Sequence, residues 1–508
     1  MFSRLKGIGL FGIDSYMIEI EADVSNGLPG FDIVGLPDAA VKESRDRVRA
    51  AIKNCGFKFP VSKITVNLAP ADRKKEGSVY DLPVLLAILK ASGQLKANLE
   101  DSIVVGEVAL DGMVRAVNGI LAITITAKEN GFKNIFVPFA NKEEAAVVEG
   151  INVYAVENVK QIIGHLEERE LLQPCERTDI SKCTYQNVPD FSDVKGQLAA
   201  KKALEVAAAG GHNILLIGPP GAGKSMLAKR LPGILPQMTF EESIESTKIH
   251  SIAGAITKDN PFVNVRPFRS PHHTVSVAGM AGGGTTPKPG EISLAHNGVL
   301  FLDELPEFKR DVMEAMRQPL EDGKVTISRV AGTLTYPSSI MFVAAMNPCP
   351  CGFFGHPTRE CTCSQNAVHK YLNRISGPML DRLDLHVEVP PVDFSELNSN
   401  KKEETSEEIR ARVNRARKIQ NERYKGTGIT CNARLTPSML KKYCVMSEEA
   451  SKYLALSFER LGMSARAYDR ILKVARTIAD LEESEIIEKN HILSAISFRS
   501  LDRKYWGK

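Results

Sequence analysis

The sequence predicts an α/β protein of several domains, and three observations support that fold class. Strand and helix patterns alternate along residues 1–168. An apolar strand at residues 213–217 leads through a glycine-rich loop into a helix, as in a parallel-sheet domain. The end of the chain is charged and helical in pattern. We therefore expect an α/β domain at 1–168, a linker at 169–188, a parallel-sheet domain at 189–395 and a C-terminal helical lid at 396–508.

The first domain contains patterns of both kinds. Alternating or apolar runs predict strands at 16–24, 63–68, 103–108, 135–137 and 153–156. Apolar residues at helical spacing predict helices over 39–55 and 82–89, the second entered through Asp81 and Pro83.

The glycine-rich loop (residues 218–225) has the pattern GxxxxGKS between a strand and a helix. Glycines let successive backbone N–H groups point inward at phosphate oxygens, and the helix N-terminus adds its positive dipole end. Lys224 then reaches the β- and γ-phosphates, and Ser225 holds Mg2+. The predicted nucleotide-binding set is Gly218, Pro219, Pro220, Gly221, Ala222, Gly223, Lys224, Ser225 and Met226.

Two later strands supply the rest of a nucleotide site. Residues 299–302 form an apolar run, typical of a buried parallel strand, that ends at Asp303 and Glu304. Asp303 is placed to bind Mg2+ through water, and Glu304 to act as general base on the attacking water. A second buried strand at 339–345 is followed by Asn347, whose amide can orient that water. The sequence thus predicts an ATPase that uses ATP and Mg2+.

Composition limits the class of protein. Hydrophobic residues at 43% and charged residues at 25% are ordinary for a globular chain of 508 residues. A net charge of +4 does not identify a nucleic-acid binder, so any basic surface has to be local. No apolar run reaches the length of a membrane span, and we expect no membrane partner. Nine cysteines, an odd number, and the need for ATP favour reduced thiols and a cytoplasmic location.

Several segments of the parallel-sheet domain and of the lid have less specific patterns. Residues 232–290 show little regular pattern, and 266–273 within them fit a nucleic-acid contact, a nucleotide-responsive loop, or a structured insert in which His272 and His273 cap helices. A helix is expected over 308–320 and a β-hairpin over 323–336, with its turn at Ala331 and Gly332. The basic helix at 406–424 is interpreted as a solvated face, and a further helix over 464–480 buries Ile471, Leu472, Ala475 and Ile478.

A cysteine cluster follows Asn347 directly. Its members are Cys349, Cys351, Cys361 and Cys363, in a CxC…CxC pattern. Four thiolates at this spacing suit a tetrahedral zinc site, with His356 as a substitute ligand. Free thiols and a disulfide are the alternatives.

Three N-terminal segments, at 31–38, 67–72 and 75–83, resemble the N-terminal domain of the ComM/YifB family of Mg-chelatase-like AAA+ ATPases. That domain is similar in fold to the proteolytic domain of Lon (the ribosomal S5 domain 2-like fold) and the C-terminal domain of RadA. Lon-type proteases use a serine nucleophile and a lysine base, whose positions fall near Val79 and Leu121 here. Ser78 and Lys75 lie close by in an alternative register. We expect a structural or DNA-contacting role for this domain rather than proteolysis.

The resemblance covers nearly the whole chain and assigns further residues. Asn347 occupies the sensor-1 position of AAA+ proteins. Arg382 matches the family's arginine-finger segment, with Arg374 as the second candidate, and an intramolecular salt bridge of Arg382 to Asp381 or Asp384 is the competing interpretation. The sensor-2 arginine corresponds to Arg466, at the start of a helix of the lid.

The same resemblance implies a hexameric ring in which the 323–336 hairpin projects into the pore and Arg329, near its tip, contacts DNA phosphates. The expected function is an ATP-driven motor on single-stranded or branched DNA, of the branch-migration or helicase type, acting in recombination or natural transformation. One alternative is a Mg-chelatase subunit, which should lack the N-terminal domain. A protein-remodelling ATPase is the other, and would usually carry an aromatic pore loop.

Overall fold

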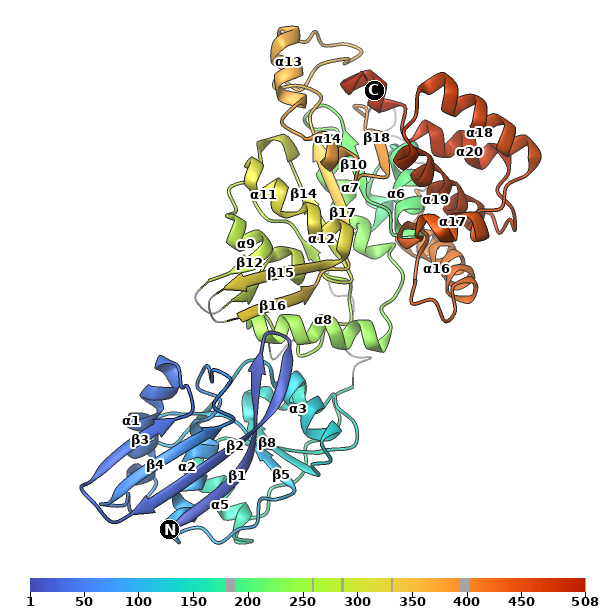
Figure 1. Cartoon of the computed structure of the whole chain (residues 1–508). Helices are drawn as coiled ribbons and strands as arrows, with labels where there is room; N and C mark the ends of the chain where they lie inside the picture. Colours follow the sequence, from blue (N-terminus) through green and yellow to red (C-terminus); the bar gives the residue numbers. More distant parts are fainter. Residues whose placement is uncertain (180–187, 258–259, 285–286, 330–331, 393–402, 508) are drawn as a thin grey trace.

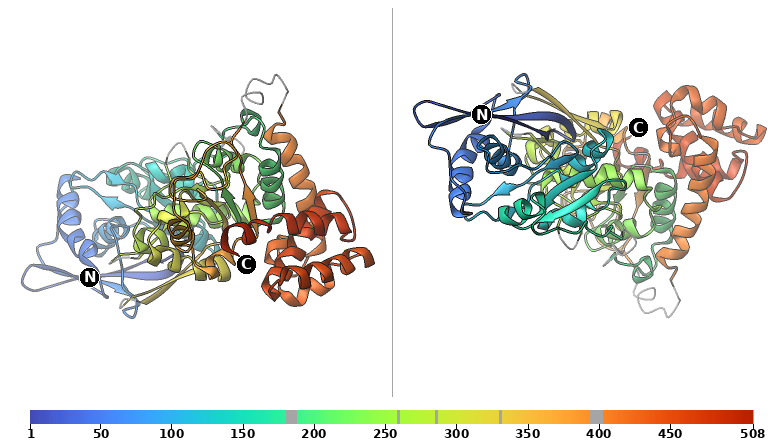
Figure 2. Two further views of the ribbon diagram at one scale, coloured as in Figure 1. Left: turned by 90° about the horizontal axis from the view of Figure 1, so that it is seen from above. Right: turned by 90° about the horizontal axis from the view of Figure 1, so that it is seen from below.

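The computed structural model describes residues 1–179, 188–257, 260–284, 287–329, 332–392 and 403–507. The fold is mixed α/β, and its three parts follow one another in space as they do in sequence (Figure 1). A mixed-sheet N-terminal domain leads to a parallel five-stranded sheet domain, which carries a C-terminal helical region. In both views of Figure 2 the helical region lies at the end of the molecule away from the N-terminal domain.

The described residues of the N-terminal domain form two larger sheets and a short two-stranded pair. The first has the order β1 (Phe2–Phe11), β2 (Asp14–Ser25), β4 (Lys63–Ala69), β3 (Gly30–Val34), and only β3 and β4 are parallel. The second is parallel and contains β5 (Ser102–Val104), β8 (Asn134–Pro138) and β9 (Asn152–Val156). The helices of the domain include α1 (Ala39–Asn54), α2 (Asp81–Ala91), α3 (Ile120–Glu129) and α5 (Val159–Leu166). The strand predicted at 103–108 is divided, because Gly106 at φ +155° separates β5 from β6 (Glu107–Val108), which pairs with β7 (Val114–Arg115).

The central sheet is parallel throughout. Its order is β11 (Phe268–Arg269), β14 (Val299–Leu302), β17 (Met341–Met346), β10 (Ile214–Ile217), β18 (Leu385–Glu388). Every residue of β10, β14 and β17 is buried, as expected for a sheet covered on both faces. Pairing of Ile217 with Met346 and of Leu302 with Ala344 brings the carboxyl ends of these three strands to one edge. The polar residues that follow the strands therefore meet there.

Two expectations about this domain are wrong. Residues 232–290 contain α8 (Phe240–Ala253), whose N-terminus carries a capping box of Thr239 and Glu242. The helix buries mostly serine and threonine, so no apolar stripe reveals it. The helix predicted over 308–320 is two helices, α11 (Arg310–Ala315) and α12 (Arg317–Asp322). Pro319 has no N–H to continue the ladder from α11, which accounts for the break near Met316.

The predicted hairpin is present as β15 (Lys324–Arg329) and β16 (Gly332–Pro337), with Arg329 paired to Gly332. Gly332 is therefore a strand residue, and Ala331 of the predicted turn lies outside the described residues. Val325 and Ile327 are buried and alternate with polar positions. Beside the hairpin lie the short elements α9 (Val277–Ala281), β12 (Gly282–Gly283), β13 (Lys288–Pro289) and α10 (Glu291–Leu294).

The N-terminal domain and the central domain are in contact at two places. The turn between β1 and β2 reaches the hairpin, where a Cβ on Gly12 would lie 3.0 Å from a methyl group of Leu334. At α8, Ser251 accepts a hydrogen bond from the N–H of Gly119 and donates one to the buried carboxylate of Glu144. Figure 1 shows α8 between the β15–β16 hairpin and α3. The β15–β16 hairpin therefore packs against the N-terminal domain.

The C-terminal helical region contains α16 (Ser406–Arg423), α17 (Pro437–Tyr443), α18 (Glu448–Leu461), α19 (Ala465–Leu481), α20 (Lys489–Ser497) and α21 (Leu501–Trp506). The predicted apolar stripe of α19 is buried. It packs on α16, α20 and α6 (Leu198–Gly210), the helix that precedes β10. Within the described ranges, no helix has the length and apolar character needed to cross a membrane.

The interpretation of α16 as a solvated face is wrong. Arg412 forms ion pairs with Glu205 of α6 and with Glu404, and Arg423 binds both carboxylate oxygens of the buried Asp480. These arginines attach α16 to its neighbours. A charge count cannot reveal this, because Glu205 and Asp480 come from distant parts of the chain.

Candidate nucleotide site and cysteine cluster

The glycine-rich loop begins where β10 ends and passes into α7 (Lys224–Arg230). Gly221 and Gly223 have φ angles of +80° and +89°, which side chains other than glycine rarely adopt. The loop forms one wall of a cavity of about 370 Å3. The cavity is lined by Pro220, Gly221, Ala222, Gly223, Lys224, Ser225, Met226, Asp303, Glu304, Met346 and Asn347. Segments that are far apart in sequence thus surround one space.

Lys224 is the cation of this cavity. Its ammonium donates hydrogen bonds to the carbonyl oxygens of Gly218 (2.7 Å) and Pro219 (2.8 Å) and to Oδ1 of Asn347 (3.1 Å). Burial lowers the pKa of Lys224 to about 8, although the nearby Asp303 and Glu304 act to raise it. A cation removed from water in this way gains strongly from a phosphate placed beside it.

Ser225 and Asp303 are in direct contact, since the serine hydroxyl donates a hydrogen bond to Oδ2 of the carboxylate. Hydroxyl, carboxylate and water oxygens are the ligands that Mg2+ prefers, usually alongside substrate phosphates. Ser225 lies at the start of α7 and Asp303 follows β14, so two elements each contribute an oxygen donor to the cavity. This donor set fits Mg2+ with a nucleotide.

Glu304 has a left-handed backbone, with φ +52° and ψ +48°, at the start of the 3-10 helix η5 (Leu305–Glu307). Such a conformation costs free energy for a residue other than glycine and is concentrated at functional sites. Its N–H donates to Oδ1 of Asp303, and its side chain is exposed at the cavity. The turn directs two consecutive carboxylates to different places: Asp303 toward Ser225, and Glu304 toward solvent.

No arginine is among the described residues that line the cavity. Arg382 is only 16% exposed and donates to the carbonyl oxygens of Arg317 (3.0 Å) and Pro378 (2.7 Å). It also forms an ion pair with Glu321. Arg382 therefore does form an ion pair within its own chain, as the alternative interpretation expected. Its partner is Glu321, however, and not Asp381 or Asp384.

The other two arginines are more exposed. Arg374, half exposed, holds both carboxylate oxygens of Glu307 at 2.9 Å. Arg466 is 70% exposed and lies 3.8 Å from Asp381, which Arg470 approaches at the same distance. Arg374 also donates to the carbonyl oxygen of Pro306 (3.4 Å) and lies over the ring of Tyr371. Surface ion pairs such as those of Arg374 and Arg466 contribute little to stability.

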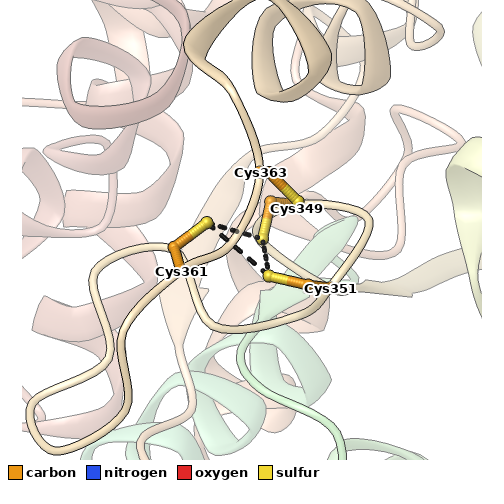
Figure 3. Close-up of side chains that lie close together, drawn as sticks. All are labelled: Cys349, Cys351, Cys361 and Cys363. Carbon is orange, nitrogen blue, oxygen red and sulfur yellow. Dashed lines mark hydrogen bonds between the residues drawn. The ribbon is translucent and has the colours of Figure 1, made fainter.

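The cysteine cluster is compact. The four Sγ atoms lie within 4.8 Å of one another, and Figure 3 shows them directed toward a common centre. Cys349 and Cys351 are 3.3 Å apart at sulfur, and each lies 3.6 Å from the sulfur of Cys361. These distances exceed a disulfide bond of about 2.05 Å, and the thiols are free. His356 is not part of the group, and its Nδ1 accepts from the N–H of Thr358 and of Arg359.

The positions that correspond to the Lon catalytic residues have no catalytic chemistry. Val79 and Leu121 are buried apolar side chains. In the alternative register, the hydroxyl of Ser78 donates to Glu107, while the ammonium of Lys75 is bound by backbone carbonyl oxygens. Ser78 and Lys75 therefore do not form a nucleophile–base pair.

The cationic segment 266–273 is a structured insert. Arg266 donates to the carbonyls of Pro236 and Asn297 and pairs with Glu242. Arg269 binds both oxygens of Glu291. The expectation that His272 and His273 cap helices is wrong, since Ser276 caps the following helix α9. The two rings lie 4.0 Å apart at an interplanar angle of 36°, and His272 contacts Thr274.

Gln197 contacts the glycine-rich loop, and sequence reasoning missed it. Its side-chain amide donates to the carbonyl oxygens of Ala222 (3.3 Å) and Pro390 (2.6 Å). The residue has φ +56° and precedes α6. It belongs to no periodic pattern, and only the fold brings it to the loop.

Comparison with known proteins agrees with this architecture. Family models described as "Magnesium chelatase, subunit ChlI", "Subunit ChlI of Mg-chelatase" and "Magnesium chelatase, subunit ChlI C-terminal" match residues 190–397, 20–141 and 403–499. The protein YifB of Salmonella typhimurium is 46% identical over 494 residues, which is 97% of this chain and 96% of the relative. The competence protein ComM of Haemophilus influenzae is 44% identical over 501 residues, with the same coverage. The chain belongs to the YifB/ComM family of Mg-chelatase-like AAA ATPases.

Proposed function

We propose that this protein is an ATPase that assembles as a hexameric ring and uses ATP hydrolysis to move single-stranded or branched DNA. The observation that carries the proposal is the convergence of the glycine-rich loop, Asp303, Glu304 and Asn347 on one cavity of about 370 Å3. A cavity of this size suits a nucleotide.

Each residue of the cavity has a role that follows from its position. The glycine-rich loop binds phosphates through its backbone N–H groups and through Lys224, which is poised by burial to gain from negative charge. Ser225 and Asp303 hold Mg2+. Bound ATP with Mg2+ supplies the electrophilic γ-phosphorus atom. Glu304 accepts a proton from the attacking water, and the side-chain amide of Asn347 orients that water.

A single chain does not complete this site, because its described lining contains no arginine to stabilise negative charge that develops during transfer. A ring solves this problem, since one protomer can donate an arginine to its neighbour. Arg374 is more exposed than Arg382 and is therefore the better candidate for the donated arginine. Arg466, in the lid of the protomer that binds the nucleotide, acts as the sensor-2 residue. Membership of an AAA family supports the oligomer.

DNA as the substrate is supported by the name of the relative ComM, a competence protein aligned over nearly its whole length. The β15–β16 hairpin is the element that would contact it. Its paired backbone places Arg329 next to the tip, and an arginine there binds phosphates without reading sequence. The hairpin tip itself lies outside the described residues.

The cysteine cluster, we further propose, holds zinc. Four sulfurs within 4.8 Å of one another, with no disulfide among them, form a donor set that a tetrahedral zinc ion fits. The ion would fix the irregular chain around residues 349–363, which has few apolar side chains of its own.

A Mg-chelatase subunit is the second candidate, because the matching family models are described as ChlI. One of these models covers residues 20–141, so the presence of the N-terminal domain does not argue against a chelatase. What favours the DNA motor is full-length similarity to ComM.

The test is the ATPase rate of the purified full chain with no polymer, with single-stranded DNA, with a fork and with a four-way junction. We expect stimulation by at least one DNA and release of a strand from the fork or junction. Lys224→Ala is the control for the site and should hydrolyse no ATP. Arg329→Ala should keep the basal rate and lose the stimulation. Turnover that no DNA stimulates would refute the DNA proposal, and Mg2+ insertion into a porphyrin would favour the chelatase.

Zinc is tested separately by elemental analysis of the purified protein. One zinc per chain is expected, and it should be lost in Cys351→Ser. Protein that carries no zinc and takes up none from solution would exclude the metal.

A further inference from the structure

The cysteine cluster lies directly against the nucleotide site. Only Pro348 separates Cys349 from Asn347, the residue predicted to orient the attacking water. Its next turn comes back to the glycine-rich loop, where Gly352 is buried against Pro220. One segment, residues 347–352, thus contributes Asn347 to the cavity lining and also contacts the glycine-rich loop at Pro220.

Gly352 has no room for a side chain. A Cβ built on it would lie 2.5 Å from Cδ and 3.1 Å from Cγ of Pro220, closer than real carbon atoms approach. Its φ of +85° also favours glycine. The backbone of residue 352 and the proline ring are therefore closely packed, and a displacement of one toward the other meets steric repulsion.

Contacts to the cluster fix the position of Gly352. Its N–H donates to the carbonyl oxygen of Cys349 at 3.0 Å, and the N–H of Phe354 donates to the sulfur of Cys349 at 3.3 Å. The turn of residues 349–352 therefore contains two of the four cysteines, Cys349 and Cys351. Coordination of a metal ion by the four sulfurs would therefore fix the conformation of this turn.

We propose that residues 349–354 act as a positioning element for the glycine-rich loop, with Gly352 as the positioning residue, and that a metal ion in the cysteine cluster sets the nucleotide affinity through this contact. The inference rests on the proposed ATPase and deepens it by naming what holds its phosphate-binding wall. Gln197 holds the same loop at Ala222, on the side of α6. The loop is thus supported at Pro220 and at Ala222 by two different parts of the chain.

The chain offers a matched pair of variants. Gly352→Ala and Gly355→Ala both place a methyl group on a glycine of positive φ in the same insert, at +85° and +75°. At Gly355 the new Cβ would meet only the end of Lys504, at 3.7 Å, which is an ordinary contact. Backbone strain is therefore similar in the two variants, and only Gly352→Ala pushes on Pro220.

The measurement is the dissociation constant of a fluorescent ATP analogue with Mg2+ in excess, together with metal content and melting temperature. We expect Gly352→Ala to bind the analogue about tenfold more weakly than the parent, from a steric cost of the usual size for overpacking. Gly355→Ala should stay within about twofold, and both variants should retain their metal. Equal binding by the two variants, or parental binding by Gly352→Ala, would overturn the proposal.

A double substitution keeps the test valid if Gly352→Ala folds poorly. Pro220→Ala removes the two ring carbons that a Cβ at residue 352 would meet. The double variant should bind the analogue nearly as well as Pro220→Ala alone, whereas additive losses would show that the two positions are not coupled.

Removal of the metal from the parent, with Mg2+ restored, should weaken analogue binding and should have less effect on Gly352→Ala. Unchanged binding after metal removal, or a cluster that takes up no metal, would refute the metal clause. A parent protein that binds no ATP would instead refute the proposed function. The two failures are therefore distinguishable.

Discussion

The ammonium of Lys224 donates a hydrogen bond across 3.1 Å to the side-chain oxygen of Asn347. This bond connects the glycine-rich loop to the carboxyl end of β17, two segments separated by more than a hundred residues. It also means that Lys224 is surrounded by neutral oxygens in addition to the carboxylates of Asp303 and Glu304 nearby. The first prediction follows from the resulting pKa.

ATP binding should weaken above pH 8. Burial lowers the pKa of Lys224 to about 8, so the side chain is charged at pH 7 and mostly neutral at pH 9. Phosphates favour the charged form, and binding at pH 9 must take up a proton. We expect an affinity about tenfold lower at pH 9 than at pH 7, measured by calorimetry in buffers of different ionisation enthalpy. Lys224→Arg stays charged throughout and should show a flat profile; parallel profiles would contradict the assignment.

Glu304→Gln should bind ATP and fail to hydrolyse it. The amide cannot accept the proton of the attacking water, so the rate should fall by about 10²–10⁴-fold while nucleotide affinity is retained. Steady-state turnover and analogue binding are measured together. Glu314→Gln, on α11 and outside the cavity lining, is the control and should keep the parental rate. An active Glu304→Gln enzyme would show that another group accepts the proton.

Arg374 and Arg382 should differ in their effects. Arg374→Ala removes one surface ion pair and a long hydrogen bond (3.4 Å) to the carbonyl oxygen of Pro306, so unfolding free energy should change by about 1 kcal/mol while hydrolysis falls by about 10³-fold or more. Arg382→Ala leaves the carbonyls of Arg317 and Pro378 without their donor and should cost roughly 1–3 kcal/mol of stability.

Mixing shows whether Arg374 acts on the neighbouring protomer. Arg374→Ala and Lys224→Ala are each expected to be inactive alone. A mixed ring contains interfaces that join an intact loop to an intact arginine, so activity should return on mixing. If the mixture stays inactive, Arg374 does not act in trans.

Asp480→Ala should unfold the C-terminal helical region easily. Asp480 is buried and accepts hydrogen bonds from Arg423, Arg476 and Asn432. Its loss leaves two cations without their carboxylate, at a cost of about 3–5 kcal/mol. Denaturant unfolding followed by circular dichroism measures this. The exposed pair Glu448–Lys452 is the matched control, and Glu448→Ala should cost less than about 1 kcal/mol. Equal costs would mean that water reaches Asp480.

Local chemistry explains what the sequence predicted. The glycine-rich loop, the acidic end of β14 and the apolar strands β10 and β17 each depend on a few neighbouring residues, and all were placed within one or two residues. The cysteine spacing likewise predicts a cluster, and the four sulfurs lie close together in the structure.

Tertiary context explains what the sequence did not predict. Helix α8 buries Ser246, Thr247 and Ser251 against the rest of the protein, so its sequence shows little regular apolar pattern. The partner of Arg382 is Glu321, sixty-one residues away, and no rule of spacing identifies it. The contact of Gly352 with Pro220 depends on how two loops cross, which periodicity cannot express.

The contact of Gly12 with Leu334 has a mechanical consequence. Strands β1 and β2 pair without interruption from Phe11 and Asp14 to Phe2 and Asp23, forming a two-stranded ribbon along one edge of the four-stranded N-terminal sheet. One end of that ribbon abuts the hairpin that is expected to touch DNA. Any movement of the hairpin toward the ribbon would therefore press on the edge of the N-terminal domain.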